Sequence, residues 1–142
     1  MFPDTFVLHN QLIEAAKKAQ DFAYTPYSNF SVGAALITKN GHIFSGCNME
    51  NHSFGLTCCA ERTAIFKMVS EKGPEEKIHI IAITTKADVS CSPCGCCRQV
   101  IQEFSTPDTM VIYKSNNKYK SMPIDSLLTD VFKKINSPNA FN

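Results

Sequence analysis

Six of the seven cysteines in this sequence fall in two short groups, and these groups restrict the folds that the chain can adopt. The first group is Cys58 and Cys59, and the second, within residues 91–97, contains a Cys-x-x-Cys pair at Cys94 and Cys97. Each group lies where a helix is predicted to begin, and the free N–H groups of a helix start stabilise a thiolate. A fold that brings the two helix starts together would collect Cys59, Cys94 and Cys97 around one metal ion.

Zinc ligation explains the cysteine spacing better than redox chemistry or disulfide bonding does. An odd number of cysteines does not suggest a disulfide framework, and a reducing compartment would keep most of them as thiols. A Cys-x-x-Cys pair alone fits half a zinc site or a thioredoxin-like redox pair, but the redox motif usually follows the first strand of a βαβ unit. Here the pair comes late in the chain, and Cys59 supplies a third ligand. Three protein ligands leave the fourth tetrahedral position of zinc to water, whereas structural sites normally fill all four.

The remaining cysteines define the main alternative, which is a structural zinc site. Cys58 or Cys96 would supply its fourth sulfur, but each is adjacent in sequence to a proposed ligand, and strain makes such neighbours poor joint ligands. We expect Cys47, Cys58 and Cys96 to be buried apolar cysteines, and Cys91 to be an exposed loop thiol.

Length and composition indicate one globular domain over residues 1–142. Hydrophobic residues make up 44% of the chain and charged residues 19%, with a net charge of +1 and no basic stripe. A protein that follows a nucleic-acid backbone usually has such a stripe, so we expect a small-molecule substrate and no nucleic-acid partner. The sequence shows neither a secretory signal pattern nor an apolar run near the roughly 20 residues that span a bilayer. We therefore expect a cytoplasmic protein without a membrane partner.

Hydrophobic periodicity and turn residues predict an α/β fold with three layers, α/β/α. The Asn-Gly pair at residues 40–41 predicts a hairpin, and Gly73-Pro74 ends a helix. A continuous β-branched run at residues 78–85 is typical of a strand buried on both faces. The order of elements predicts one mixed five-stranded sheet with helices on both faces. The predicted helices are 5–23, 59–71, 95–104 and 124–135, and the predicted strands are 30–38, 42–47, 78–85, 109–113 and 119–122.

Two segments resemble the zinc motifs of the cytidine deaminase family: residues 59–64 (Cys-Ala-Glu-Arg-Thr-Ala) and residues 93–99 (Pro-Cys-Gly-Cys-Cys-Arg-Gln). The wider zinc-deaminase signature has His-x-Glu followed by Pro-Cys-x-x-Cys. Cys59 stands where that histidine would be, so the chain resembles the small, homotetrameric, three-cysteine branch. Residues 27–36 look like the early strand of the family, and residues 46–51 like its nucleoside-binding segment. The resemblance covers nearly the whole chain.

This resemblance implies a zinc-dependent hydrolase that converts cytidine and deoxycytidine to uridine and deoxyuridine with release of ammonia, in pyrimidine salvage. One Zn²⁺ per subunit would be held by Cys59, Cys94 and Cys97. Glu61 would take a proton from the attacking water and pass protons to the ring and to the leaving amine. Because Zn²⁺ with three thiolates carries a net charge of −1, we infer from its position that Arg62 donates hydrogen bonds to sulfur.

The resemblance also implies the residues that hold the nucleoside. Asn48 and Glu50 match family residues that hydrogen-bond the ribose, and Phe30 matches an aromatic residue packed against the base. The backbone near Ala60 would hold the carbonyl oxygen of the ring. In this branch neighbouring subunits of a homotetramer complete each pocket, and Phe132 matches the aromatic residue that the partner supplies.

The chain departs from the family pattern at three positions, and other functions stay open. Thr129 stands in place of a usual proline, Phe54 in place of a frequent tyrosine, and His52 in place of a small residue near the nucleoside. One alternative is a deaminase of a cytidine-like antibiotic, and another is a deaminase of polynucleotide cytosine, which would favour a basic channel and a stacking surface. A non-catalytic zinc or redox module is the third, and it predicts no functional loss on Glu61→Ala.

Overall fold

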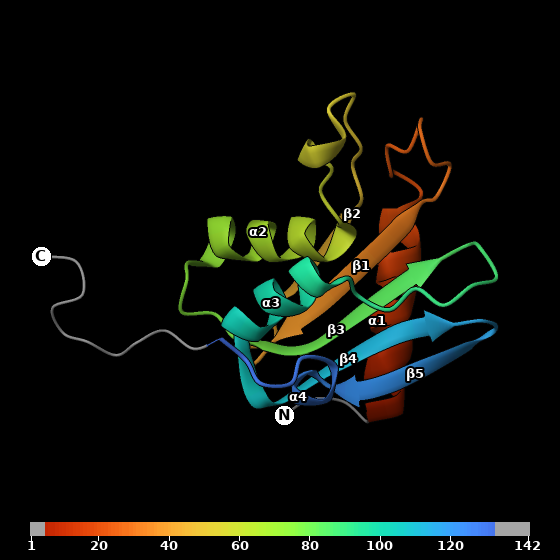
Figure 1. Ribbon diagram of the computed structural model, residues 1–142. Helices are drawn as coiled ribbons and strands as arrows, with labels where there is room; N and C mark the ends of the chain where they lie inside the picture. Colours follow the sequence, from red (N-terminus) through yellow and green to blue (C-terminus); the bar gives the residue numbers. More distant parts are fainter. Residues whose placement is uncertain (1–4, 133–142) are drawn as a thin grey trace, which may run out of the picture.

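The computed structural model describes residues 5–132, and its centre is one five-stranded sheet with the strand order β2-β1-β3-β4-β5 (Figure 1). Strands β3 and β4 run parallel, and the other neighbouring pairs run antiparallel. The predicted mixed five-stranded sheet is therefore confirmed. The strands are β1 (Val32–Thr38), β2 (Ile43–Cys47), β3 (Ile78–Thr85), β4 (Ser105–Ser115) and β5 (Lys118–Pro123).

Helices cover both faces of the sheet and enclose two separate cores (Figure 1). Helix α1 (Thr5–Gln20) packs on one face, where its Leu12 and Ala16 meet Ala35 of β1. The other face is covered by three helices, which are α2 (Ala60–Lys72), α3 (Gly95–Glu103) and the short α4 (Ile124–Leu127).

No helix in the described part of the chain has the length and apolar character of a membrane span.

The directions of two strands bring the starts of α2 and α3 to the same edge of the sheet. Both β2 and β3 run antiparallel to β1, so they point the same way, and Gly33 of β1 pairs with Cys47 on one side and Thr84 on the other. The chain leaves β2 through residues 48–59 and enters α2, and it leaves β3 through residues 86–94 and enters α3. The two helix N-termini therefore begin beyond the carboxyl ends of the two strands that flank β1, and the carboxyl ends of strands are where open α/β sheets commonly bind ligands.

Gly46 allows α2 to lie close against the sheet. A Cβ atom built on Gly46 would lie 2.6 Å from the backbone N of Ala64 and 2.9 Å from the carbonyl O of Ala60. Contacts this short are not tolerated by backbone atoms, so only glycine permits this approach. The position of Cys59, which caps α2, therefore depends on a residue of the neighbouring strand.

Three predicted elements differ from the structure by more than two residues at one end, and the others agree to within two residues. The first helix ends at Gln20 rather than residue 23, and β4 begins at Ser105 rather than residue 109. The helix predicted over 124–135 ends at Leu127, because Leu128 is extended and Asp130 adopts a left-handed φ of 53°. Thr and Asp have low helix propensity, which agrees with this early end. The predicted residues 133–135 lie outside the described part of the chain.

Candidate metal centre and active site

Three cysteine sulfurs meet where α2 and α3 begin. Cys59 is the N-cap residue of α2, and Cys94 is the N-cap residue of α3. The Sγ atoms of Cys59 and Cys94 are 4.0 Å apart, and the sulfurs of Cys59, Cys94 and Cys97 all lie within 4.8 Å of one another. The backbone N–H of Cys97 donates to Cys94 Sγ at 3.5 Å. Cys97 is buried, Cys59 is partly buried and Cys94 is exposed, so the cluster lies at the boundary between core and solvent.

The donor set and its spacing fit a zinc ion. Zinc binds thiolate at about 2.3 Å in tetrahedral geometry, so two sulfur ligands lie about 3.8 Å apart. The 4.0 Å between Cys59 and Cys94 is close to this value. Within residues 5–132, neither Cys58 nor Cys96 belongs to the sulfur group. The described residues therefore offer three ligands and leave one tetrahedral position open, as catalytic zinc sites do.

Hydrogen bonds to Cys59 stabilise its thiolate. The thiol of Cys97 and the guanidinium of Arg62 hydrogen-bond to Cys59 and lower its pKa to about 5, while desolvation acts in the opposite direction. Arg62 Nη2 donates to Cys59 Sγ at 3.4 Å and to the carbonyl O of Thr57 at 3.3 Å. The hydrogen bond to Cys59, together with burial, raises the pKa of Cys97. These contacts favour the thiolate form of Cys59 beside the cation of Arg62.

Glu61 is a buried carboxyl group beside the sulfur cluster. It lies in the first turn of α2, and only 4% of its surface is exposed. Burial raises its pKa to about 7, and the negative charge of Cys59 adds to this effect. A first-turn helix carboxylate is normally solvated at the surface. Its burial here places a group able to carry protons next to the candidate metal position.

The environments of the four other cysteines differ from the sequence-based expectation. The prediction for Cys91 is wrong: it is buried, because its backbone N–H donates to the carbonyl O of Lys114 at 2.8 Å and holds this loop against β4. Burial raises the pKa of Cys91 to about 12, with the charges of Glu61 and Cys59 adding to it. Cys96 was expected to be buried but is exposed, and Cys47 and Cys58 are partly buried. The expected burial is therefore wrong for Cys91 and Cys96, while Cys47 and Cys58 are intermediate between buried and exposed.

Asn48 and Glu50 make hydrogen bonds to the backbone of the preceding loop. Asn48 is buried; its Oδ1 accepts from the N–H of Val32 at 2.8 Å, and its Nδ2 donates to the carbonyl O of Phe30 at 2.9 Å. Glu50 Oε2 accepts from the N–H groups of Tyr27 at 2.9 Å and Ser28 at 3.2 Å. Both side chains keep further hydrogen-bonding capacity, since a carboxylate has about four acceptor positions and an amide nitrogen has two donors.

The structure brings some of the other predicted residues near the cluster and leaves one exposed to solvent. Ala60 follows Cys59 directly as the first, fully buried residue of α2. Phe30 is partly buried and packs against the core on the α2 side of the sheet. Phe132 is 83% exposed, so its ring faces solvent rather than the core of its own chain.

A pocket of about 300 Å³ lies between the loop after α1 and the loop before α2. Its polar wall contains Glu50, and its aromatic wall contains Tyr27 and Phe54, whose rings meet edge to face at 5.5 Å. The hydroxyl of Tyr27 also lies 3.4 Å from Nδ1 of His52. Sequence reasoning did not single out Tyr27 as a pocket residue, and its aromatic ring after a proline was the available signal. A larger cavity of about 690 Å³ near the end of α3 contains none of the three clustered cysteines.

In this fold two helix N-termini meet at three thiols, and a buried carboxyl group lies beside them. These features define a class of zinc-binding α/β proteins with an open catalytic position. Comparison with known proteins makes this class specific. The sequence pattern of the cytidine and deoxycytidylate deaminase zinc-binding region matches residues 7–114. The chain belongs to the cytidine and deoxycytidylate deaminase family.

Comparison by sequence and comparison by structure both find relatives named cytidine deaminase. The cytidine deaminase of Sporosarcina psychrophila is 44% identical over 126 residues, which cover 87% of this chain and 90% of that protein. The crystal structure of cytidine deaminase from Burkholderia pseudomallei has a TM-score of 0.80 and 44% identity, covering 87% of this chain and 98% of that chain. A more distant relative, the blasticidin-S deaminase of Bacillus cereus, is 33% identical over 83% of this chain and 87% of its own length.

Proposed function

We propose that this protein is a cytidine deaminase that hydrolyses cytidine and deoxycytidine to uridine and deoxyuridine and releases ammonia. The observation that carries the proposal is the convergence of three cysteine sulfurs within 4.8 Å, with the buried Glu61 in the adjacent helix turn. Relatives named cytidine deaminase, 44% identical over most of the chain, support the same reaction. Residues 1–142 are proposed to act as one catalytic domain.

Cys59, Cys94 and Cys97 are proposed to hold one zinc ion per subunit. Zinc bound with an open position lowers the pKa of water toward neutrality and polarises a substrate. The N-termini of α2 and α3 keep the ligands as thiolates. Arg62 donates a hydrogen bond to Cys59 Sγ at 3.4 Å and offsets the net negative charge of a three-thiolate site.

Glu61 is proposed to move the protons of the reaction. It is buried beside the three cysteines and is not one of the proposed zinc ligands. It is therefore available to accept a proton from water and to return protons to N3 and to the departing amine. The exchange balances: the C4–N4 bond breaks and a C4–O bond forms. One water molecule supplies the O4 oxygen and the N3 hydrogen of uridine and the third hydrogen of ammonia.

The nucleoside is proposed to lie between the cluster and the pocket bounded by Glu50. Asn48 and Glu50 would bind the ribose with the hydrogen-bonding capacity that their backbone contacts leave unused, while Phe30 would pack against the base. The N-terminal backbone of α2 at Ala60 would bind the carbonyl oxygen of the ring. A free base would leave the polar groups of Asn48 and Glu50 without their ligand, so it should be a poor substrate.

A homotetramer with shared pockets completes the proposal. Several aromatic and aliphatic side chains are largely exposed in the single chain, including Phe22 (82%), Phe54 (73%) and Phe132 (83%). Contiguous apolar surface marks interaction sites, and contacts between subunits of a homotetramer would cover such side chains. Phe132 would enter the pocket of a neighbouring subunit. A cytoplasmic location and a role in pyrimidine salvage stay predictions from the sequence.

The test is the conversion of cytidine to uridine, followed by ultraviolet absorbance, with bound zinc measured in the same samples. Wild type should turn over cytidine, and Glu61→Gln should lose about 10²- to 10⁴-fold in kcat while keeping its zinc. Cys94→Ser should lose both zinc and activity. Zinc-loaded wild type that leaves cytidine and deoxycytidine unchanged would overturn the proposed reaction.

The blasticidin-S deaminase relative supports one second candidate, a deaminase of a cytidine-like antibiotic. The same assay separates the two functions when kcat/KM is measured for cytidine and for blasticidin S. We expect cytidine to be the better substrate. A higher kcat/KM for blasticidin S would assign the second function instead.

A further inference from the structure

Helix geometry leaves two carbonyl groups without a partner inside their own helices, one directly before Cys94 and one at the end of α4. The carbonyl O of Pro93 precedes the N-cap residue Cys94, so it lies outside the hydrogen-bond ladder of α3. The carbonyl O of Leu127 ends the four-residue helix α4, whose last carbonyl groups have no partner within the helix. Carbonyl groups in partly buried positions need donors from elsewhere in the chain.

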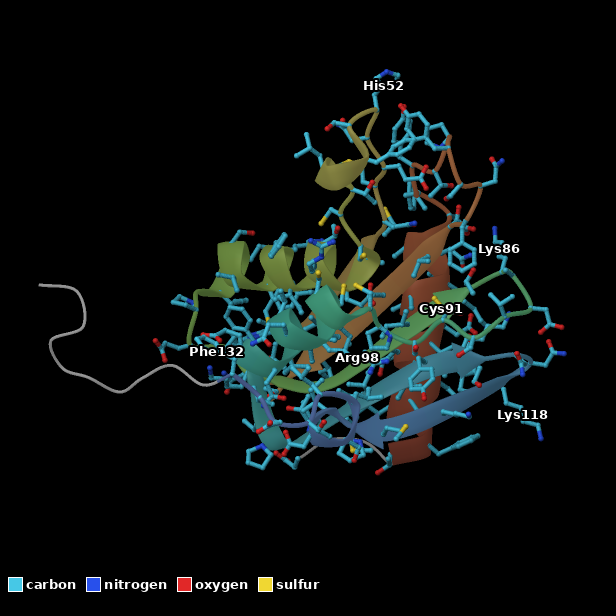
Figure 2. The ribbon with its side chains drawn as sticks, viewed as in Figure 1. His52, Lys86, Cys91, Arg98, Lys118 and Phe132 are labelled. Atoms are coloured by element: carbon cyan, nitrogen blue, oxygen red, sulfur yellow. The ribbon has the colours of Figure 1, made fainter. Side chains whose placement is uncertain are left out.

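Arg98, labelled in Figure 2, supplies both donors from one guanidinium group. Its Nε donates to the carbonyl O of Pro93 at 2.8 Å, and its Nη1 donates to the carbonyl O of Leu127 at 2.8 Å. Its backbone N–H also donates to the carbonyl O of Cys94 at 2.9 Å. One residue in the first part of α3 therefore holds both peptide carbonyls flanking the start of the metal-binding motif, and joins them to α4.

We propose that Arg98 is a positioning residue that fixes the orientation of Cys94 for zinc binding. The same side chain fixes the position of residues 128–132 relative to the loop of residues 86–94. The inference rests on the proposed function, in which Cys94 is a ligand. Because the Pro93 peptide directly precedes Cys94, its orientation sets the direction of the Cys94 side chain. Because Leu127 directly precedes residues 128–132, the same guanidinium also fixes the start of the segment that carries Phe132.

The two-carbonyl bridge requires arginine. A guanidinium is a planar fork with five N–H donors, so two of its nitrogens reach acceptors on different elements at once. A lysine ammonium has a single nitrogen on a flexible stem and would serve one carbonyl well at a time. Arg98→Lys should therefore give a partial defect, and Arg98→Met should remove both arms of the bridge.

Lys114 provides a matched control. Its Nζ donates to the carbonyl O atoms of Thr85 at 3.0 Å and Ala87 at 2.9 Å, at the other end of the same loop. Lys114→Met therefore removes two similar hydrogen bonds from a cation to carbonyls, but at positions distant in sequence from Cys94. A purely structural role of Arg98 predicts the same behaviour for the two methionine variants.

The experiment measures zinc release to a chromogenic chelator and amide hydrogen exchange over residues 124–132, using zinc-loaded protein. Arg98→Met should release zinc about 10- to 100-fold faster than wild type, the range for lost support of a metal ligand. It should also speed exchange at the amide of Leu128, which donates to Ile124 O at 3.0 Å. Lys114→Met should change neither rate beyond its effect on the unfolding temperature, and Arg98→Lys should lie between.

The outcomes separate this inference from the proposed function. Zinc release by Arg98→Met that matches Lys114→Met would overturn the positioning role, as would Arg98→Lys behaving like wild type. Should Arg98→Met fail to fold, the comparison of Arg98→Lys with wild type decides the question. Cys94→Ser that retains zinc would instead remove the basis in the proposed function, and neither readout depends on turnover of a nucleoside.

Discussion

Arg62 is the cation that balances the charge of the cysteine cluster. Zinc with three thiolates carries a net charge of −1, and Arg62 donates a hydrogen bond to one of these sulfurs at 3.4 Å. The contact with Cys59 raises the pKa of Arg62 above its usual range, so this charge is permanent. Excess negative charge at the metal weakens its acidifying effect on water, and Arg62 is proposed to offset that charge.

We expect Arg62→Gln to weaken zinc binding about 10- to 100-fold, because hydrogen-bond partners of metal ligands contribute at this level. The measurement is competition for zinc between the protein and a chelator of known affinity. Arg62→Lys keeps the charge and serves as the control for geometry. Unchanged zinc affinity in Arg62→Gln would show that the hydrogen bond to Cys59 does not support the metal.

We expect His79 on β3 to make the fold sensitive to acid. Burial lowers its pKa below 6.5, the cation of Lys39 adds to this effect, and Asp108 opposes it. Lys39 Nζ lies 3.1 Å from His79 Nδ1, which suits a neutral imidazole. Because the pKa is lower in the folded state, stability from the neutral ring is complete above about pH 6.5 and is lost as pH falls toward the folded pKa.

We expect His79→Gln to flatten the fall in urea-unfolding stability as the pH drops below about 6.5, relative to wild type. The difference between the two pH profiles removes contributions that both proteins share, including protonation of the zinc ligands. Parallel profiles for wild type and His79→Gln would assign the acid sensitivity to other groups.

At this scale the sequence predicted the cluster but not its surroundings. Cysteine spacing and predicted helix starts were sufficient to bring together Cys59, Cys94 and Cys97, because a helix start is a local property. The burial of Cys91 was not predictable, since it depends on a hydrogen bond to Lys114, a residue distant in sequence. The same holds for Asn48, whose partners lie in an irregular loop without periodicity.

Among the elements, the contact between α2 and β2 links the sheet to the metal site. A Cβ on Gly46 would clash with the backbone of α2 at Ala60 and Ala64, so Gly46→Ala must push the helix outward. We expect a loss of about 1–3 kcal/mol in the free energy of unfolding, together with faster zinc release because Cys59 caps the displaced helix. Chemical denaturation and a chelator assay give the two values.

Gly55 is the control for this substitution. A Cβ at Gly55 meets no atom within 4 Å, so Gly55→Ala should leave zinc release unchanged and stability nearly so. Equal behaviour of Gly46→Ala and Gly55→Ala would show that α2 adjusts freely, contrary to the expectation.

Most elements were predictable because local patterns and packing agree. The buried strand β3 was predicted over the same residues that the structure gives, 78–85, because a β-branched run between turn residues has few alternatives. The early start of β4 was missed, since Pro107 and Asp108 disfavour a strand by themselves. Ser105 pairs with Ile78 there through a register shift that only the sheet determines. The last helix was predicted to be too long, because the apolar residues 127, 128 and 131 recur at helical spacing although α4 ends at Leu127.

At the scale of the whole molecule, the exposed Phe132 makes the shared pocket testable by complementation. Glu61→Ala and Phe132→Ala should each have low activity alone. If each pocket combines Glu61 of one subunit with Phe132 of another, random hybrid tetramers contain both native residues in about a quarter of their pockets. We expect the co-expressed mixture to exceed the activity of either variant, measured by cytidine turnover after sedimentation confirms the assembly. Activity equal to the average of the two variants would exclude shared pockets.

The 4.0 Å separation of the Cys59 and Cys94 sulfurs has a consequence for storage and handling of the protein. Two thiols at this distance need only a small approach to form a disulfide bond. Dioxygen in air would accept the two electrons and two protons that they give up and become hydrogen peroxide. Bound zinc shields the sulfurs from this reaction. Protein stripped by a chelator in air should therefore become locked in an oxidised form that recovers metal only after a reductant is added, so purification history determines how much of a preparation is active.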